Sequence, residues 1–279
     1  MAARSATEPR PWTFYVLAML FGAYLLFLYG PMVVIGVLSF QGPNGGVTFP
    51  MVGVSVDWFL DILKPGMMAD IPVSFSRSLT LALVVSLATV AMSVAAGLAF
   101  RRNFPGSGLV FYFAVASLVM PSLLVGFGIG LGFRFLDLEP SLFTSALAAQ
   151  LTWTLPFGLF MMFAVINRFN RSWEEAATDL GASPWQRLRH VTLPILMPGI
   201  IGVGIAAFTL SYDEYARTTL TIGAKNTMPL EIYALISSQT SPTLFAIGTL
   251  TTAGSFLLIA ITLVLVVRTQ RKRGLIKID

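Results

Sequence analysis

The residues that could do chemistry in this 279-residue chain are few. The sequence contains no cysteine, which excludes thiolate metal sites, and its one histidine, His190, cannot build a histidine-based metal site alone. No glycine is followed directly by lysine, so the Gly-x-x-x-x-Gly-Lys-[Ser/Thr] loop that cradles nucleotide phosphates is absent. We therefore expect no catalytic residue, no metal site and no cofactor bound by this chain.

The main candidates for a chemical role are acidic residues beside a long apolar run. Asp213 and Glu214 follow Tyr212 at the outer end of the run over 195–215. Charged residues in or beside a membrane span are costly and are often functional, so these carboxylates could attract a cationic solute. Two alternatives stay open: the carboxylates face water at the interface, or they pair with Arg217, about one helical turn further on.

A second candidate lies in the apolar run over 142–166. Trp153 and Gln150 could line a solute pathway there, and the alternative is that they pack inside the protein. Eight acidic residues fall on the same predicted side of the membrane as Asp213. They are Asp57, Asp61, Asp70, Asp137, Glu139, Asp213, Glu214 and Glu231. This bias would steer cations toward that side, and it could equally complement a basic protein partner.

Long apolar runs must position these residues. Hydrophobic residues make up 56% of the chain and charged residues only 11%, far below the roughly 25% of a soluble domain. Six runs are each long enough to cross about 30 Å of hydrocarbon as a helix. They cover about 12–38, 75–100, 109–133, 142–166, 195–215 and 244–267. Because these runs do not alternate as barrel strands do, we predict an all-α membrane protein with one transmembrane domain over 1–279.

The third run, over 109–133, contains a proline and two glycine motifs. Pro121 interrupts it, while the rest of its length is apolar. Two overlapping small-residue motifs, Gly126-x-x-x-Gly130 and Gly128-x-x-x-Gly132, lie within it. Such motifs are typical of closely packed membrane helices.

Basic residues predict how the spans are oriented. With the N-terminus inside, 13 of the 18 Lys and Arg residues fall on the inner side of the membrane. These include Arg4, Arg10, Arg273 and Lys277 near the two ends of the chain. Because lysine and arginine are enriched on the cytoplasmic side, we expect both termini in the cytoplasm. The basic residues are spread between apolar runs, which suits a lipid surface rather than nucleic acid.

The loop over 168–194 has the local chemistry of two short helices. Each predicted helix begins with a capping box, in which a serine and an acidic or amide residue three positions later close free backbone donors. The two pairs are Ser172–Glu175 and Ser183–Gln186. Gly181 suits the left-handed end of the first helix. We expect Leu193-Pro194 to end the second helix, because the residue before a proline disfavours helical geometry.

The same loop resembles a known signature. Glu175-Ala176-Ala177, Gly181 and Leu193-Pro194 match the EAA signature of bacterial import permeases in residue type and spacing, with Val191 where that family usually has isoleucine. In the family this loop forms a coupling helix that sits in a cleft of the ATP-binding subunit. The resemblance implies that role here, and the alternative is that Glu175 only caps a helix and Gly181 only ends one.

Two further stretches resemble the polyamine (spermidine/putrescine) branch of these permeases. They are Ser211-Tyr212-Asp213-Glu214 with 227–233, and Leu28-Tyr29-Gly30-Pro31-Met32 with 39–40. The resemblance implies the type I permease fold of an ABC importer, with about six transmembrane helices and cytoplasmic coupling helices. It also implies a place in the bacterial inner membrane and a translocation path for a small solute, such as a polyamine.

The resemblance also implies partners. They would be two copies of an ABC ATP-binding subunit that hold ATP and Mg, a second homologous but non-identical permease, and a periplasmic solute-binding protein. An importer of another small solute, such as an amino-acid derivative or a metal chelate, is one alternative. A secondary transporter and a membrane enzyme are two further alternatives. The transporter would need ionisable residues near the middle of the membrane, and the enzyme would need a reactive residue with a partner.

Overall fold

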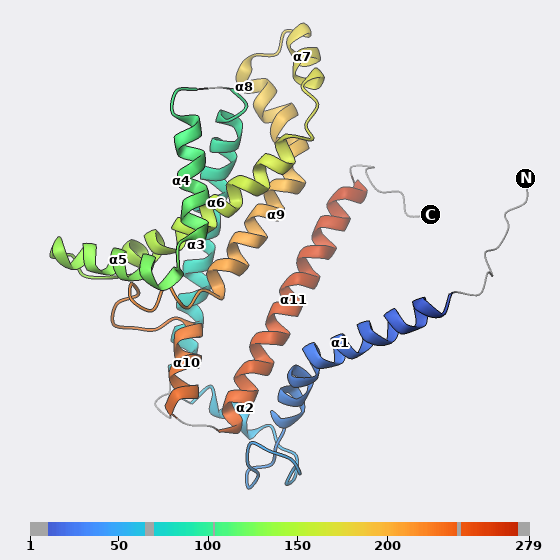
Figure 1. The fold of residues 1–279 in the computed structure, drawn as a ribbon, viewed down its shortest axis with the longest axis vertical. Coiled ribbons are helices and arrows are strands. Elements are labelled where there is room, and N and C mark those ends of the chain that lie inside the picture. The colour runs from blue at the N-terminus through green and yellow to red at the C-terminus, as the bar shows by residue number, and fades with distance from the viewer. Residues whose placement is uncertain (1–10, 65–69, 103, 239–240, 273–279) are drawn as a thin grey trace, which may run out of the picture. The chain divides into compact units, whose positions relative to one another are not determined.

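The computed structural model describes residues 11–64, 70–102, 104–238 and 241–272. These residues form helices and loops, and their only β-type pairing is an isolated antiparallel bridge between Gln41 and Val54 (Figure 1). The chain divides into two compact units. One is Met68–Ala234, and the other combines Met1–Met67 with Leu235–Asp279. The predicted all-α architecture is confirmed, whereas the prediction of one transmembrane domain stays a prediction.

The apolar runs become helices close to their predicted bounds. These helices are α1 (Trp12–Leu38), α3 (Ile71–Ala99), α6 (Leu147–Ile166), α9 (Leu193–Tyr212) and α11 (Pro242–Lys272). Among the described residues, four helical stretches are long and apolar enough to cross a bilayer, and one bent pair of helices would make a fifth. The sixth predicted run, 244–267, lies inside α11. Arg4, Arg10, Arg273 and Lys277, which support the predicted orientation, lie outside the described residues.

The third run does not form a single straight span. It forms α4 (Ser107–Val119) and α5 (Ser122–Phe135), which meet at an angle of 108°. Met120 has extended backbone angles, φ −65° and ψ 134°, as expected for a residue that precedes a proline. Pro121 lacks the N–H that would continue the helix. The run over 109–133 is therefore bent at Pro121, with α5 directed away from α4 (Figure 1), and its crossing of the membrane as one span stays a prediction.

Helices α3, α6 and α9 pack against one another and form the centre of the unit Met68–Ala234 (Figure 1). Polar contacts connect them: Ser86 Oγ donates to the Gly204 carbonyl at 2.7 Å, and Thr89 Oγ1 donates to Thr154 Oγ1 at 2.9 Å. A Cβ atom at Gly158 would lie 2.7 Å from Thr89 Cγ2, so glycine lets α6 approach α3. Small residues and short interhelical hydrogen bonds are the usual means of helix association in lipid.

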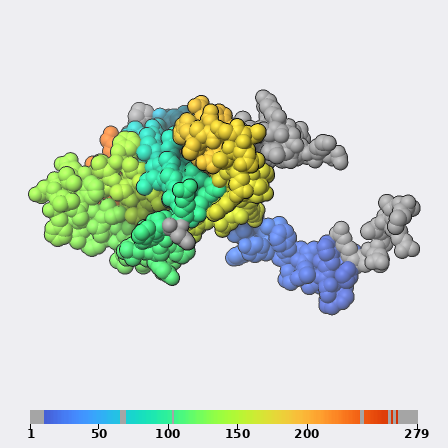
Figure 2. All heavy atoms as spheres, turned by 90° about the horizontal axis from the view of Figure 1, so that it is seen from above, coloured from blue at the N-terminus to red at the C-terminus, as the bar shows by residue number. Residues whose placement is uncertain are grey.

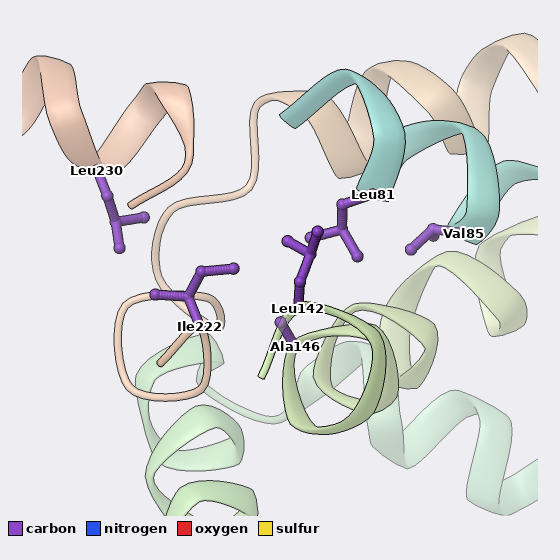
Figure 3. Close-up of a cluster of buried hydrophobic side chains, with 6 residues drawn as sticks. All are labelled: Leu81, Val85, Leu142, Ala146, Ile222 and Leu230. Carbon is purple, nitrogen blue, oxygen red and sulfur yellow. The ribbon is translucent and has the colours of Figure 1, made fainter. Parts of the chain in front are cut away.

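A buried apolar cluster attaches the segment after α9 to this centre. Leu81 and Val85 come from α3, Leu142 and Ala146 from the π-helical turn η1 (Leu142–Ala146), and two more side chains from residues beyond α9 (Figure 3). The last two are Ile222, in the loop, and Leu230, on α10 (Met228–Ser238). Arg77 reinforces this attachment, because its guanidinium donates to the Lys225 carbonyl at 2.7 Å. The loop over 213–227 is therefore anchored to the helices.

In the other unit, a buried glutamine organises the first loop. Gln41 is fully buried, its Nε2 donates to the Gly46 carbonyl at 2.9 Å, and its Oε1 accepts from the Val52 N–H at 2.8 Å. Trp58 Nε1, on the short helix α2 (Asp57–Asp61), donates to the Gln41 carbonyl at 2.7 Å. These bonds satisfy polar groups that would be costly to bury alone.

The glycines of α5 belong to two different environments. A Cβ atom at Gly126 would lie 2.7 Å from the Arg217 carbonyl oxygen, and one at Gly130 would lie 2.6 Å from the Leu220 carbonyl oxygen. No atom lies within 4 Å of a Cβ atom built at Gly128 or Gly132. The first small-residue motif thus gives close packing, but against the backbone of a loop rather than against a second helix.

This difference predicts opposite effects for the same substitution. We expect Gly126→Ala to lower the free energy of unfolding by about 1–3 kcal/mol, because the new methyl group meets backbone that cannot easily move. Gly128→Ala, the matched control, should be neutral or stabilising by up to about 1 kcal/mol. Thermal unfolding of the detergent-purified variants checks this, and equal midpoints for the two variants would contradict it.

Candidate functional site

The residues 168–194, called the EAA segment from here on, form two short helices. They are α7 (Ser172–Asp179) and α8 (Pro184–Arg187), shown above the other helices of their unit in Figure 1. Gly181 has φ +85° between them, and its N–H donates to the Thr178 carbonyl at 2.8 Å. The Ala182 N–H donates to the Ala177 carbonyl at 3.0 Å. The predicted left-handed end of the first helix is therefore confirmed.

One of the two predicted capping boxes is present. The Ser183 N–H donates to Gln186 Oε1 at 2.7 Å, and the Gln186 N–H donates to Ser183 Oγ at 3.4 Å. The box at Ser172 was wrong, because α7 has no side-chain cap from it. Instead, the Ser172 N–H donates to Asn170 Oδ1 at 3.0 Å. A local turn closed by an asparagine thus takes the donor that the box would have used.

The expected end of the second helix at Leu193-Pro194 was also wrong. α8 continues through the π-helical turn η2 (Leu188–Thr192) directly into α9, which gives a helical stretch of 29 residues over Pro184–Tyr212. At the wide turn the Leu193 N–H donates to the Leu188 carbonyl, five residues back. This register change accommodates the missing N–H of Pro194 without ending the helix. The second half of the EAA segment is therefore continuous with a membrane-spanning helix.

A charged network attaches the EAA segment to the end of α3. Arg101 donates through two nitrogens to Glu174, with distances of 2.8 Å to Oε1 and 2.6 Å to Oε2. Thr192 Oγ1, at the end of η2, donates to Glu174 Oε1 at 2.6 Å. One carboxylate on α7 thus joins α3 to the helix that becomes α9. A paired arginine–carboxylate contact of this kind is geometrically specific as well as strong.

The surroundings of the network favour its charged state. The hydrogen bond from Arg101 is the main cause that holds the pKa of Glu174 below its usual value, and the Thr192 hydroxyl adds to it. The same bond raises the pKa of Arg101. Phe169 covers the guanidinium, with Arg101 Cζ 5.2 Å from the ring centroid. Arg171 adds a bond to the Arg101 carbonyl at 3.3 Å.

Sequence reasoning missed Glu174 and selected its neighbour. Glu175, Ala176 and Gly181, which the signature selects, lie at exposed positions. Glu174 instead bonds to Arg101 and Thr192, and only 21% of its side chain is exposed. The available signal was a second carboxylate opposite the Arg101-Arg102 pair, but nothing in the sequence brings residues 73 positions apart together.

Three large apolar side chains of the EAA segment are exposed in the described chain. Trp173, Leu180 and Trp185 are 48%, 89% and 64% exposed. In Figure 2 the yellow and orange surface of the segment lies beside the teal end of α3. A cleft of about 410 Å³ runs between them, lined by Glu175 and Arg187 among others. Large apolar side chains exposed on a helical surface are typical of a docking site for another protein.

The acidic candidates at the far end of α9 separate into two environments. Asp213 is exposed, whereas the side chain of Glu214 is only 7% exposed. Glu214 Oε1 accepts from the Arg217 N–H at 2.7 Å, and Glu214 Oε2 lies 3.8 Å from Arg217 Nη1. Of the two alternatives for Glu214, facing water or pairing with Arg217, the pairing is therefore the one observed. Tyr212 stacks on Phe208, with ring centroids 6.1 Å apart.

Arg217 connects this cluster to two other elements. Its Nη1 donates to Ser122 Oγ, at the start of α5, at 2.7 Å. Its Cζ lies 5.2 Å from the centre of the Trp153 ring on α6. Gln150, the other candidate on α6, is buried, and its Nε2 donates to Thr218 Oγ1 at 2.9 Å. For Gln150 the packing alternative is therefore the one observed.

The network at Glu174 predicts a pH-dependent loss of stability. We expect Glu174→Gln to lower the free energy of unfolding by roughly 1–3 kcal/mol at neutral pH, because Arg101 loses its charged partner. The lowered pKa of Glu174 means that its contribution is fully present above the unfolded-state pKa and is lost as pH falls through the folded-state pKa. The stability difference between wild type and Glu174→Gln should therefore shrink in acid.

Thermal unfolding at neutral pH and across the acidic range measures this difference. Glu175→Gln is the matched control, since Glu175 is exposed, and it should change stability by less than about 0.5 kcal/mol. A larger effect of Glu175→Gln than of Glu174→Gln would contradict the prediction.

Solved structures with a similar fold are transporters. The chain aligns with a bacterial ABC transporter involved in the import of the acidic polysaccharide alginate, with a TM-score of 0.64 and 16% identity over 95% of this chain and 98% of that one. It also aligns with a bacterial alginate ABC transporter in complex with an alginate pentasaccharide-bound periplasmic protein, with a TM-score of 0.59, 17% identity, and 95% of each chain covered. At this identity the likeness shows the fold, and it confirms the predicted permease fold of an ABC importer.

Curated relatives cover nearly the whole chain. The Spermidine/putrescine transport system permease protein PotC of Escherichia coli (strain K12) is 26% identical over 250 residues, which cover 89% of this chain and 90% of the relative. The Putrescine transport system permease protein PotI of the same strain is 28% identical over 249 residues, covering 86% of this chain and 85% of the relative. Residues 88–271, more than half of the chain, match the profile of one family. The chain therefore belongs to the family of binding-protein-dependent transport system inner membrane components.

Proposed function

We propose that this chain is a permease subunit of an ATP-driven ABC importer and that its solute is a polyamine. The observation that carries the importer mechanism is the attachment of the EAA segment to two membrane helices: covalently to α9 through η2, and through Glu174 to the end of α3. Family membership supports the transport role. The similarity to the polyamine permeases PotC and PotI, together with the resemblance at 211–214, supports the polyamine assignment.

The attachment suggests how force would pass through the permease. The exposed apolar face of the EAA segment, with Trp173, Leu180 and Trp185, would dock into a cleft of an ATP-binding subunit. Two copies of that subunit would hold ATP and Mg, and this chain would carry no ATPase site. A displacement of α7 and α8 would then move α3 and α9 as one rigid body, which alternates the pathway between its two openings.

Two further partners and the orientation belong to the same proposal. A second, homologous but non-identical permease would complete the pathway, and a periplasmic solute-binding protein would deliver the solute. The family description, "binding-protein-dependent", supports that partner. The EAA segment and both termini would lie in the cytoplasm, and Asp213 would lie toward the periplasm. Reporter fusions at Lys64 and after Asp279 test this orientation, and a cytoplasmic signal at Lys64 would contradict it.

On this proposal the exposed Asp213 and the stacked ring of Tyr212 would meet the solute first. A carboxylate attracts an alkylammonium group, and an aromatic face stabilises it. Trp153 and Glu214 lie deeper, in contact with Arg217. The four residues would provide acidic and aromatic groups along the route of a polycation.

Uptake by the reconstituted importer tests the function. We expect ATP-dependent uptake of spermidine or putrescine into proteoliposomes that contain both permeases, the ATP-binding subunits and the binding protein. Vanadate should abolish uptake and an uncoupler should not, because ATP hydrolysis rather than an ion gradient supplies the energy. Inhibition by the uncoupler alone would indicate a secondary transporter instead.

Gly181 gives a test of coupling at the EAA segment. Its φ of +85° is strained for a β-branched side chain, whereas asparagine tolerates this region. We expect Gly181→Val to reduce uptake at least about tenfold while ATP hydrolysis continues, because a shift of this turn displaces α7 from its cleft. Gly181→Asn, the matched control, should retain most of the coupling. Equal transport per ATP in both variants would count against docking through this segment.

A further inference from the structure

A buried guanidinium lies between an aromatic face and a carboxylate in the unit Met68–Ala234. Only 3% of the Arg217 side chain is exposed. Its Cζ lies 5.2 Å from the Trp153 ring centroid, and its Nη1 lies 3.8 Å from Glu214 Oε2. An aromatic face beside a carboxylate is the arrangement with which proteins recognise organic cations. Here a side chain of the protein itself occupies it.

The hydrogen bonding of this arginine is incomplete. Arg217 Nε and Trp153 Nε1 are both buried and have no hydrogen-bond partner among the described residues. A buried arginine that serves only structure is expected to have its donors satisfied, since an unpaired buried donor is costly. The contact to Glu214 Oε2 is also long for an ion pair between desolvated groups. The short bond of this guanidinium goes to a neutral hydroxyl, that of Ser122, whereas Arg101 makes two short bonds to one carboxylate.

Arg217 contacts α5 through both its side chain and its backbone. Ser122, which accepts from Arg217, is the first residue of α5, directly after the break at Met120-Pro121. Gly126 of α5 packs on the Arg217 backbone. A rotation of α5 about that break would therefore disturb the bond to Ser122 that holds the guanidinium in place.

We propose that Trp153 and Glu214 form a binding site for an alkylammonium group of the transported solute and that Arg217 occupies this site as an internal competitor. The proposal rests on the proposed function for the identity of the solute, but not for the existence of the cation site. In the closed state Arg217 fills the site and keeps it from binding cations. When α5 moves and the Ser122 bond is lost, the Arg217 side chain withdraws and the ammonium group takes its place.

Direct binding to the assembled transporter tests the competition. Radiolabelled spermidine is titrated onto the complete complex in nanodiscs without the binding protein, so that only the permease site is measured. We expect Arg217→Gln to bind spermidine about tenfold more tightly than wild type, because the competing cation is gone. Arg217→Lys should lie between the two, since its ammonium group stacks less well on Trp153. The double variant Arg217→Gln with Trp153→Leu should lose the gain.

A second titration does not depend on the solute. Methylguanidinium is added to the Arg217→Ala complex while tryptophan fluorescence is followed. We expect a saturable change that is absent from wild type and from Arg217→Ala with Trp153→Phe. This signal without any spermidine binding would support the cation site and contradict the polyamine assignment.

Two results would overturn the proposal. One is that both variant complexes assemble and both tests fail. The Arg217→Gln complex would then bind spermidine no more tightly than wild type, and the Arg217→Ala complex would give no fluorescence change with methylguanidinium. The other applies if the neutral variants do not assemble: Arg217→Lys then decides, and an affinity equal to or weaker than wild type would show that Arg217 is only structural.

Discussion

The attachment of the EAA segment to the packed helices depends on one interaction, the pairing of Glu174 with Arg101 and Thr192. Without it, α7 would keep a bond from Arg187 to Thr178, on the side of α9, and would lose its charged contact with the end of α3. With it, the exposed apolar face of the EAA segment and the ends of α3 and α9 become one mechanical piece. The pair is effective because it is partly shielded from water and because both carboxylate oxygens are used, which fixes orientation as well as distance. An exposed pair at the position of Glu175 would contribute little of this rigidity.

Three prolines have different effects on the helices that contain or adjoin them. At Pro121 the preceding residue is extended, and the helix turns by 108° into α5. At Pro194 the π-helical turn η2 shifts the hydrogen-bond register, so the helix continues from α8 into α9. Pro156 lies inside α6, which stays one helix. The break at Pro121 turns α5 away from the direction of α4, whereas continuity at Pro194 makes the second half of the EAA segment and α9 one helix. On the proposed function, the continuous helix would transmit movement of the EAA segment to α9.

The unit Met68–Ala234 has an arginine–glutamate pair at each end, and the two pairs differ in geometry and burial. At the EAA segment the arginine–carboxylate pair is short and doubly bonded, which suits a permanent connection. At the end of α9 the pair of Arg217 and Glu214 is longer, more deeply buried and incompletely satisfied. A buried pair of that kind is weak support for stability by itself, because desolvation offsets much of the attraction. Its geometry is better suited to a contact that is exchanged during the transport cycle.

The sequence by itself determined the features that depend on neighbouring residues: the apolar runs that become helices, the left-handed turn at Gly181, the capping box at Ser183 and the spacing of the EAA signature. The tertiary structure decided which residues meet. In it Glu174, rather than Glu175, bonds to Arg101, and Glu214 pairs with Arg217. The third run bends at Pro121, and the helix that begins with α8 continues past Pro194. Local patterns record helix propensity and turn geometry, because these arise within a few residues. They cannot record a bond between residues 73 positions apart, since that bond exists only once α3, α6 and α9 have packed.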